Sequence, residues 1–317
     1  MVCVSDAAFD EFSYLPAQAD ALGIPVPPVR RLTHRLGDGR VISALRFGDS
    51  GSAPPVTFLH GAGLNAHTWD TTVLHLGLDA LVLDLPGHGD SSWRDDARYT
   101  GRTLAADIEP AIREWTGGVA QVLVGHSLGG LTAAALAARH PDLVRSLVLV
   151  DISPGIDPDG AASSIRAFFA GPVDWASRDE LVERALSFGL GGSRDAAARG
   201  VSLNSRVRPD GRVEWKHHFA HLANRLAADP AGAAAVDEAQ RANAGILSAA
   251  GWDDLAAVTA PVTLVTGARG FLTEADREEF LRRMPRTRRI ELDSAHNVQE
   301  ERPAELAACI RTAHDDR

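Results

Sequence analysis

The sequence predicts an α/β fold in which helices cover both faces of a mostly parallel sheet and a mainly helical segment is inserted into it. Three observations support this prediction. Short apolar runs recur along the chain, at 56–59, 81–84, 122–124 and 147–150. Stretches of helical periodicity lie between them, notably 103–115 and 128–140. The alternation stops after residue 151 and resumes at 262–266, and alternating strands and helices imply right-handed crossovers and a parallel sheet.

The N-terminal elements precede this alternation. Leu32–Arg35 and Val41–Phe47 flank a GlyAspGly turn and are predicted to form a β-hairpin. The segment before them, 9–23, is expected to be a peripheral helix. The helix over 128–140 is expected to stop before Pro141, which cannot continue it.

The middle of the chain is predicted to be a cap inserted into the sheet domain. Residues 152–250 are rich in Ala, Arg and Glu, and a hairpin is expected at Pro209, Asp210 and Gly211. The core would then comprise 1–151 and 251–317. Its second part is expected to hold a strand at 262–266, a helix from about Thr273, a strand at 289–292 and a helix after Pro303.

Composition restricts the function. With 317 residues, 45% hydrophobic, the chain can bury a large core, and its net charge of −10 disfavours binding to nucleic acid or anionic lipid. Two cysteines, Cys3 and Cys309, cannot build a disulfide framework, which fits a reducing compartment. The first residues do not resemble a signal peptide, and no apolar stretch approaches about 18 residues. We expect a cytoplasmic protein that does not span a membrane.

Ser127 is the strongest candidate for a reactive residue. It lies in ValGlyHisSerLeuGlyGly, a GxSxG pattern placed between an apolar strand and a helical stretch. A strand that turns abruptly into a helix strains the residue at the turn, and small residues such as Gly125 and Gly129 are needed on either side. The same turn directs the backbone N–H of Leu128 at an oxyanion formed beside Ser127. The alternative is a glycine-rich turn with an idle serine.

A second oxyanion donor is expected from HisGlyAlaGly at 60–63, which follows the strand at 56–59. A glycine-flexible loop there would point the Ala62 N–H inward, although a plain tight turn would produce the same pattern. His60 is expected to organise this loop. Gly61 and His126 flank the predicted oxyanion donor and nucleophile, and we include them among the residues expected to line the substrate site.

These motifs, together with AspLeuProGlyHisGlyAspSer at 84–91, occur in an order and spacing that resemble the α/β-hydrolase superfamily over nearly the whole chain. The resemblance implies a cap over the active site, a triad in the order serine, acid, histidine, and no obligatory cofactor. Asp84 and His88 belong to the loop typical of this fold and are expected to be structural.

The resemblance places the base at His296, in AspSerAlaHisAsn after the last strand. An imidazole must take the serine proton and return it to the leaving group. Neighbouring His126 is expected to point away from the nucleophile. His217, His218 and His221 contain an i,i+4 pair that suits metal binding, but no carboxylate is patterned with them, so no metal is predicted.

The acid departs from the commonest pattern of the superfamily. Many relatives have an Asp after the seventh strand, where this chain has Gly270. Some members take the acid from the end of the sixth strand, where this chain has Asp151, 24 residues after Ser127. Asp151 is therefore the first candidate, and its alternative role is to end the strand. Glu274 and Asp276 follow, but both are expected in the first turn of a helix capped by Thr273.

The predicted activity is hydrolysis of a carboxylic ester or lactone by acyl transfer. A nucleophilic Ser127 excludes the relatives that use Asp there, the haloalkane dehalogenases and epoxide hydrolases. Carbon–carbon bond hydrolases, cofactor-free dioxygenases and non-catalytic ligand receptors of the superfamily stay open. The substrate is expected to be a small apolar or aromatic molecule, and a homodimer is compatible with the sequence. Aromatic residues expected to line its pocket are Trp69, Phe168, Phe169, Trp175, Phe188 and Trp215.

Overall fold

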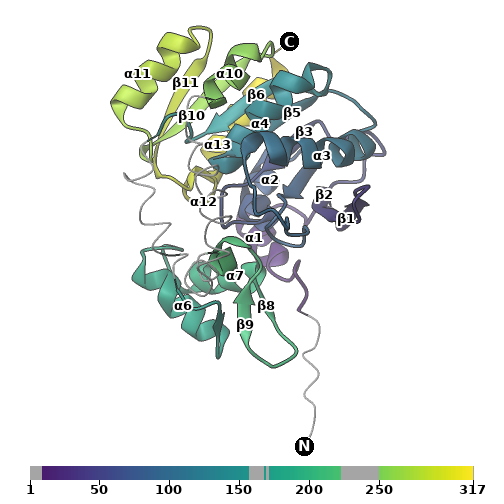
Figure 1. The fold of residues 1–317 in the computed structure, drawn as a ribbon, viewed down its shortest axis with the longest axis vertical. Helices are drawn as coiled ribbons and strands as arrows, with labels where there is room; N and C mark the ends of the chain where they lie inside the picture. The colour runs from purple at the N-terminus through teal and green to yellow at the C-terminus, as the bar shows by residue number, and fades with distance from the viewer. Residues whose placement is uncertain (1–8, 157–167, 169–170, 223–249, 317) are drawn as a thin grey trace, which may run out of the picture.

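The computed structural model describes residues 9–156, 168, 171–222 and 250–316 (Figure 1). Its main sheet has eight strands in the order β1-β2-β4-β3-β5-β6-β10-β11. Strands β1 and β2 form an antiparallel hairpin, β2 also pairs antiparallel with β4, and every pair from β4 to β11 is parallel. The predicted α/β class with a mostly parallel sheet is confirmed. The strands are β1 (Val29–Arg35), β2 (Val41–Phe47), β3 (Val56–Leu59), β4 (Ala80–Asp84), β5 (Gln121–His126), β6 (Val144–Val150), β10 (Val262–Arg269) and β11 (Arg288–Ala295).

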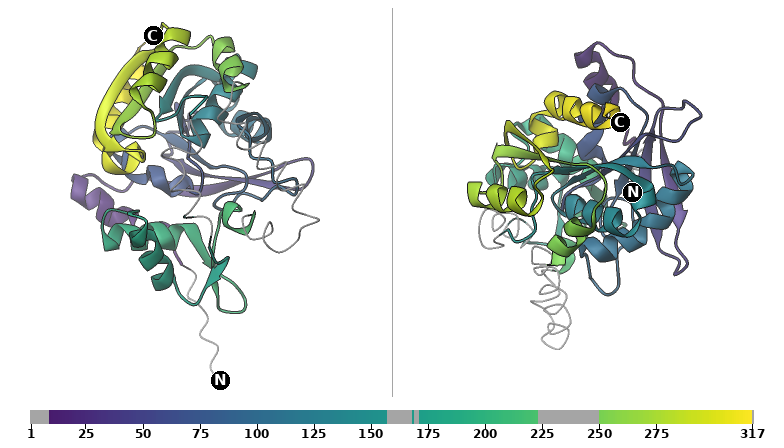
Figure 2. Two further views of the ribbon diagram at one scale, coloured as in Figure 1. Left: turned by 60° about the vertical axis from the view of Figure 1, so that its left-hand side comes forward. Right: turned by 90° about the horizontal axis from the view of Figure 1, so that it is seen from above.

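Helices cover both faces of this sheet, as Figure 2 shows. Alternate side chains of one strand enter two different cores, because successive residues of a strand point to opposite faces. On β5, Leu123 joins the cluster under α3, α4 and α10, whereas Val122 and Val124 join the cluster under α1, α2 and α13. The α-helices of the sheet domain are α1 (Leu15–Leu22), α2 (Asp70–Leu76), α3 (Gly101–Thr116), α4 (Leu128–Arg139), α10 (Ala250–Ala257), α11 (Glu274–Arg283), α12 (Val298–Glu301) and α13 (Pro303–Asp315), with 3₁₀ turns η1 (Ala66–Trp69) and η2 (Pro141–Leu143).

The N-terminal helix is shorter than the sequence predicted. It begins at Leu15, not near Phe9, and Pro16 lies in its first turn. Proline is tolerated there because the first N–H groups of a helix have no partner within it. Residues 11–14 form a turn instead, with the Phe12 N–H donating to Asp10 Oδ1 at 3.0 Å.

Residues 174–215 build a smaller unit with its own sheet and apolar cluster. Its three-stranded antiparallel sheet has the order β7-β9-β8, and the β8–β9 hairpin turns at the predicted Pro209-Asp210-Gly211. Figure 1 shows this unit beyond one edge of the main sheet, away from α11. The elements of the unit are β7 (Asp174–Trp175), α6 (Arg178–Ser187), α7 (Arg194–Asn204), β8 (Ser205–Val207) and β9 (Val213–Trp215).

None of the helices that the structure describes is long and apolar enough to cross a bilayer.

Candidate active site

The predicted site residues gather at one edge of the main sheet because the parallel strands end there together. Ser127 follows β5, Asp151 follows β6, and the loop from His60 follows β3. These three strands are neighbours, and β10 and β11 extend the sheet beyond β6. Ligand and catalytic groups of open α/β sheets collect outside the carboxyl ends of such strands.

Ser127 lies at a strained turn between β5 and α4. Its backbone has φ 51° and ψ −120°, a conformation that residues other than glycine rarely adopt. A Cβ on Gly125 would lie 2.4 Å from the Gly129 carbonyl oxygen, and one on Gly129 would lie 2.3 Å from that of Leu59. Both positions therefore require glycine, as the sequence predicted. The Ser127 N–H donates to the Val150 carbonyl at 3.1 Å and fixes the turn to β6, while the residue stays half-buried.

His296 is held by Asp151. The imidazole Nδ1 lies 2.7 Å from Asp151 Oδ2, and both side chains are buried. The carboxylate also accepts the Gly267 N–H at 3.1 Å and the Phe271 N–H at 2.8 Å. Three donors therefore fix the carboxylate, which in turn leaves Nε2 of His296 as the nitrogen able to accept a proton. His296 also lies beside the nucleophile turn, because its carbonyl accepts a hydrogen bond from His126 Nε2 at 3.0 Å.

The alternative acids serve other purposes. Asp276 Oδ2 accepts the Thr273 N–H at 2.8 Å and forms a capping box at the start of α11. Glu274 is exposed and pairs with Arg277 and Arg289. Of the three carboxylates that the sequence proposed, Asp151 is the one bonded to His296.

Gly270 makes room for this arrangement. A Cβ at that position would lie 2.2 Å from Asp151 Oδ1, so any side chain there would displace the carboxylate. The position of the Asp151 carboxylate therefore depends on the glycine at position 270.

Phe271 is a site residue that the sequence analysis missed. Its ring stacks on the His296 imidazole with centroids 3.6 Å apart and an interplanar angle of 9°. The same residue donates its backbone N–H to Asp151. The available signal was an aromatic residue directly after Gly270 in the loop that follows β10. Phe271 thus limits the rotation of the imidazole from one face.

His126 is buried beside His296. Its ring centroid lies 4.5 Å from that of His296, and its exposed fraction is 1%. Burial and the nearby His296 hold its pKa well below the usual value, so it is neutral. This placement favours a packing role, and we leave His126 out of the proposed substrate contacts.

The loop after β3 is ordered around the Gly61 carbonyl. His60 Nδ1 lies 2.8 Å from this oxygen, and the Leu64 N–H donates to it at 3.2 Å. His60 Nε2 accepts the Leu85 N–H at 3.0 Å, so the ring carries its proton on Nδ1. Burial lowers the pKa of His60, which agrees with a neutral ring. His60 therefore organises the loop as predicted.

Fixing the Gly61 carbonyl also orients the Ala62 N–H, because the peptide unit is planar and its N–H points opposite to its C=O. A Cβ on Gly61 would lie 3.2 Å from Cβ of Ser127, so the loop packs directly against the nucleophile turn. The second predicted donor, Leu128, is the first residue of α4. An N–H in the first turn of a helix has no partner within the helix.

Most of the aromatic side chains predicted to line a pocket pack against one another. Phe168 lies 5.6 Å from Trp215 and 5.5 Å from Phe188 between ring centroids, and Trp175 packs on the same cluster. Trp69 is fully buried in the main core against Phe58. These contacts favour core roles for Trp69, Phe168 and Trp215. Phe169 lies outside the residues that the structure describes.

The remaining polar motifs have structural partners. Asp84 accepts the Ala66 N–H at 2.8 Å and Arg31 Nη1 at 2.7 Å. Burial alone would raise the pKa of Asp84, but the Arg31 charge and the backbone donors outweigh it and lower the pKa. His88 donates to the Pro86 carbonyl at 3.1 Å, and His218 stacks on Trp93. Among the described residues, no cluster of three His, Cys, Asp or Glu side chains is arranged to hold a metal ion.

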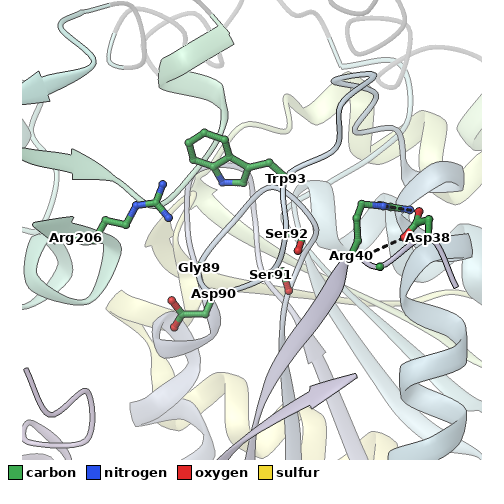
Figure 3. A pocket seen from close by; sticks show the side chains of 9 residues that line it. Asp38, Arg40, Gly89, Asp90, Ser91, Ser92, Trp93 and Arg206 are labelled. Carbon is green, nitrogen blue, oxygen red and sulfur yellow. Dashed lines mark hydrogen bonds and ion pairs between the residues drawn. The ribbon is translucent and has the colours of Figure 1, made fainter. Parts of the chain in front are cut away.

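A cavity of about 650 Å³ opens beside the β1–β2 turn and strand β8. Figure 3 shows the side chains that line it. Neither Ser127 nor His296 lines it. Its charged side chains are paired within the protein, since Arg40 bonds Asp38 and Arg206 bonds Glu214 while covering the Trp93 ring at 5.3 Å. We therefore do not assign the substrate to this cavity. Its lining residues are Asp38, Gly39, Arg40, Gly89, Asp90, Ser91, Ser92, Trp93 and Arg206.

Comparisons with known proteins match most of the chain. A family model described as alpha/beta hydrolase fold matches residues 54–303. The chain is 37% identical over 318 aligned positions to esterase Rv0045c of Mycobacterium tuberculosis, covering 97% of each protein. A solved structure of that esterase superposes with a TM-score of 0.78 at 35% identity, over 97% of this chain and 99% of the other. Lipase LipV of the same organism is 28% identical over 84% of this chain and 95% of its own length.

Proposed function

Because the chain belongs to the alpha/beta hydrolase fold family, we propose that it is an esterase that cleaves a carboxylic ester or lactone of a small apolar or aromatic molecule. The observation that carries the proposal is the 2.7 Å contact between His296 Nδ1 and Asp151 beside the strained turn at Ser127. The near-full-length similarity to an esterase supports the ester as substrate class.

In the proposed reaction, Ser127 Oγ attacks the carbonyl carbon while His296 Nε2 takes the hydroxyl proton. The N–H groups of Ala62 and Leu128 stabilise the oxyanion. His296 then gives its proton to the leaving alcohol oxygen, and the acyl group stays on Ser127. Water attacks this acyl-enzyme with His296 again as base, which releases the acid and restores the serine. Asp151 keeps the imidazole oriented and stabilises its charged form throughout.

We propose that a core domain of residues 1–151 and 251–317 carries out this chemistry. A cap of residues 152–250 would select the substrate. The separate apolar cluster around Phe168 and Trp215 supports such a cap. A lid that excludes water strengthens every electrostatic interaction inside the site.

Kinetics on a panel of aryl esters, lactones and vinylogous diketones test the proposal. Ser127→Ala, His296→Ala and Asp151→Asn are each expected to lower kcat/KM for esters by about 1000-fold or more. Asn at 151 would also turn an amide N–H toward the donors that now bond the carboxylate. Glu274→Gln and His314→Ala are matched controls expected to retain activity, since their side chains pair on the surface.

Retention of ester turnover by Ser127→Ala would refute serine catalysis. Activity confined to the diketones, or oxygen uptake with an aromatic heterocycle, would replace the ester with another reaction of the same site.

A further inference from the structure

The cap contacts the oxyanion loop through two asparagines at the end of α7. Asn204, the last residue of α7, donates from Nδ2 to the Gly63 carbonyl at 2.6 Å. In the opposite direction, Asn65 Nδ2 donates to the Leu203 carbonyl at 3.0 Å. The two bonds join segments about 140 positions apart, so they tie the cap unit to the loop that carries Ala62.

Asn65 has a second task in the loop. Its Oδ1 accepts the His67 N–H at 3.0 Å and caps the 3₁₀ turn η1. The side chain is buried, with an exposed fraction of 6%. Because one side chain both ends the loop and holds the cap, the loop and the end of α7 are fixed relative to each other.

The bond from Asn204 leads to the proposed oxyanion donor through two peptide units. Asn204 donates to the carbonyl of the Gly63–Leu64 peptide, and the N–H of that peptide donates to Gly61 O at 3.2 Å. The Gly61 carbonyl belongs to the peptide unit whose N–H is that of Ala62. Hydrogen-bonded amides in series orient one another and also polarise one another. This series of hydrogen bonds therefore ends at the Ala62 N–H, the group that would bind the oxyanion.

The cap end of this series is itself fixed. The Asn204 carbonyl accepts the Lys216 N–H at 2.9 Å, which ties the α7–β8 junction to the segment after β9. Gly63, where the cap bond arrives, has a positive φ of 74°. Because glycine has more conformational freedom than other residues, a hydrogen bond to its carbonyl restrains a turn that the residue itself does not fix.

We propose that Asn204 is a positioning residue of the active site, through which the cap holds the Ala62 N–H in line with the oxyanion. The inference rests on the proposed function. It makes the cap more than a cover, since the cap then sets the geometry of one oxyanion donor through an amide side chain. Displacement of the α7 end by a poorly fitting substrate would loosen that donor and slow the chemical step.

The test compares Asn204→Ala and Asn204→Asp with the wild type on one aryl ester. Both variants remove the N–H donor, and Asp keeps the size of the side chain. We expect kcat to fall roughly three- to tenfold with KM changed less than twofold, because one neutral hydrogen bond is lost from the transition state. The Ki of an aryl trifluoromethyl ketone should rise by the same factor, because its adduct with Ser127 places an oxyanion in the same position.

Arg212→Ala is the matched control. It removes an ion pair with Asp174 inside the same small sheet, and the hydrogen bonds that its guanidinium makes to described residues go to Asp174. We expect it to retain kcat, KM and Ki within twofold, and melting temperatures of all variants report whether the fold persists.

Unchanged kcat and Ki in both Asn204 variants, a loss confined to KM, or an equal loss in Arg212→Ala would each overturn the role of Asn204. A wild-type protein that neither hydrolyses esters nor binds the ketone would instead refute the proposed function, and this inference with it.

Discussion

Gly270 illustrates how a single missing side chain determines the arrangement of the site. The Asp151 carboxylate occupies the space that a Cβ at position 270 would need, at 2.2 Å from Oδ1. The carboxylate cannot retreat without losing its bonds to the Gly267 and Phe271 N–H groups. The space at Gly270 and the two N–H donors together therefore fix the position of the Asp151 carboxylate.

Gly270→Ala is accordingly expected to lower kcat at least tenfold, because the methyl group displaces the carboxylate that orients His296. Gly37→Ala is the matched control, since a Cβ there meets nothing within 4 Å. Steady-state kinetics and melting temperatures of both variants provide the measurement. Full activity in Gly270→Ala would mean that Asp151 does not need its present position.

At this scale the sequence predicted residues that have a local signature. The glycines around Ser127 predicted a strained turn, and the position of Asp151 at the end of β6 predicted it as the acid. Asn204 has no such signature, and the only local signal for Phe271 is an aromatic residue directly after Gly270. The importance of both residues comes from contacts with His296 and Gly63, which lie elsewhere in the chain. His126 adjoins the nucleophile in sequence but points to the His296 carbonyl.

Among the elements, those with strong periodicity or clear punctuation were predicted within a few residues. The β1–β2 hairpin, the strands of the parallel sheet and helices α3 and α4 are examples. Helix α2 was not predicted, because AspThrThrValLeuHisLeu contains β-branched residues with low helix propensity. Packing against α13 and the left-handed Gly77 at its C-terminus stabilise it instead.

The segment before α1 is joined to the core by a buried charge network. His67 Nδ1 lies 3.0 Å from Asp70 Oδ2, and its Nε2 lies 3.1 Å from Glu11 Oε2. Burial disfavours the charged imidazole, but the carboxylates of Asp70 and Glu11 outweigh it and raise the pKa of His67 to about 9. The folded protein therefore keeps this proton in a range where the unfolded chain loses it.

A folded-state pKa above the unfolded value of 6.5 contributes stability that is complete below pH 6.5 and disappears as the pH rises through about 9. The wild type should thus be more stable than His67→Gln at pH 6, by on the order of 1–3 kcal/mol. This difference should shrink by pH 9.5. Urea unfolding of both proteins at the two pH values measures it, and a difference independent of pH would show that His67 is neutral in the folded protein.

For the whole molecule, the order of strands brings together groups that are remote in sequence. Ser127, Asp151 and the His60 loop follow three neighbouring parallel strands. Phe271 lies in the loop after β10, and His296 lies directly after β11. The alternation of elements predicted a parallel sheet but not the order β1-β2-β4-β3-β5-β6-β10-β11. That order depends on which faces pack against each other, a property of the assembled core.

The central claim is that Ser127 is a nucleophile activated by His296, and covalent labelling tests it most directly. We expect intact-mass and peptide spectrometry after treatment with an aryl fluorophosphonate to show one adduct per chain, located at Ser127. Ser127→Ala should show none, and His296→Ala should react far more slowly. An unmodified wild-type chain, or an adduct located at another residue and retained in Ser127→Ala, would contradict the account.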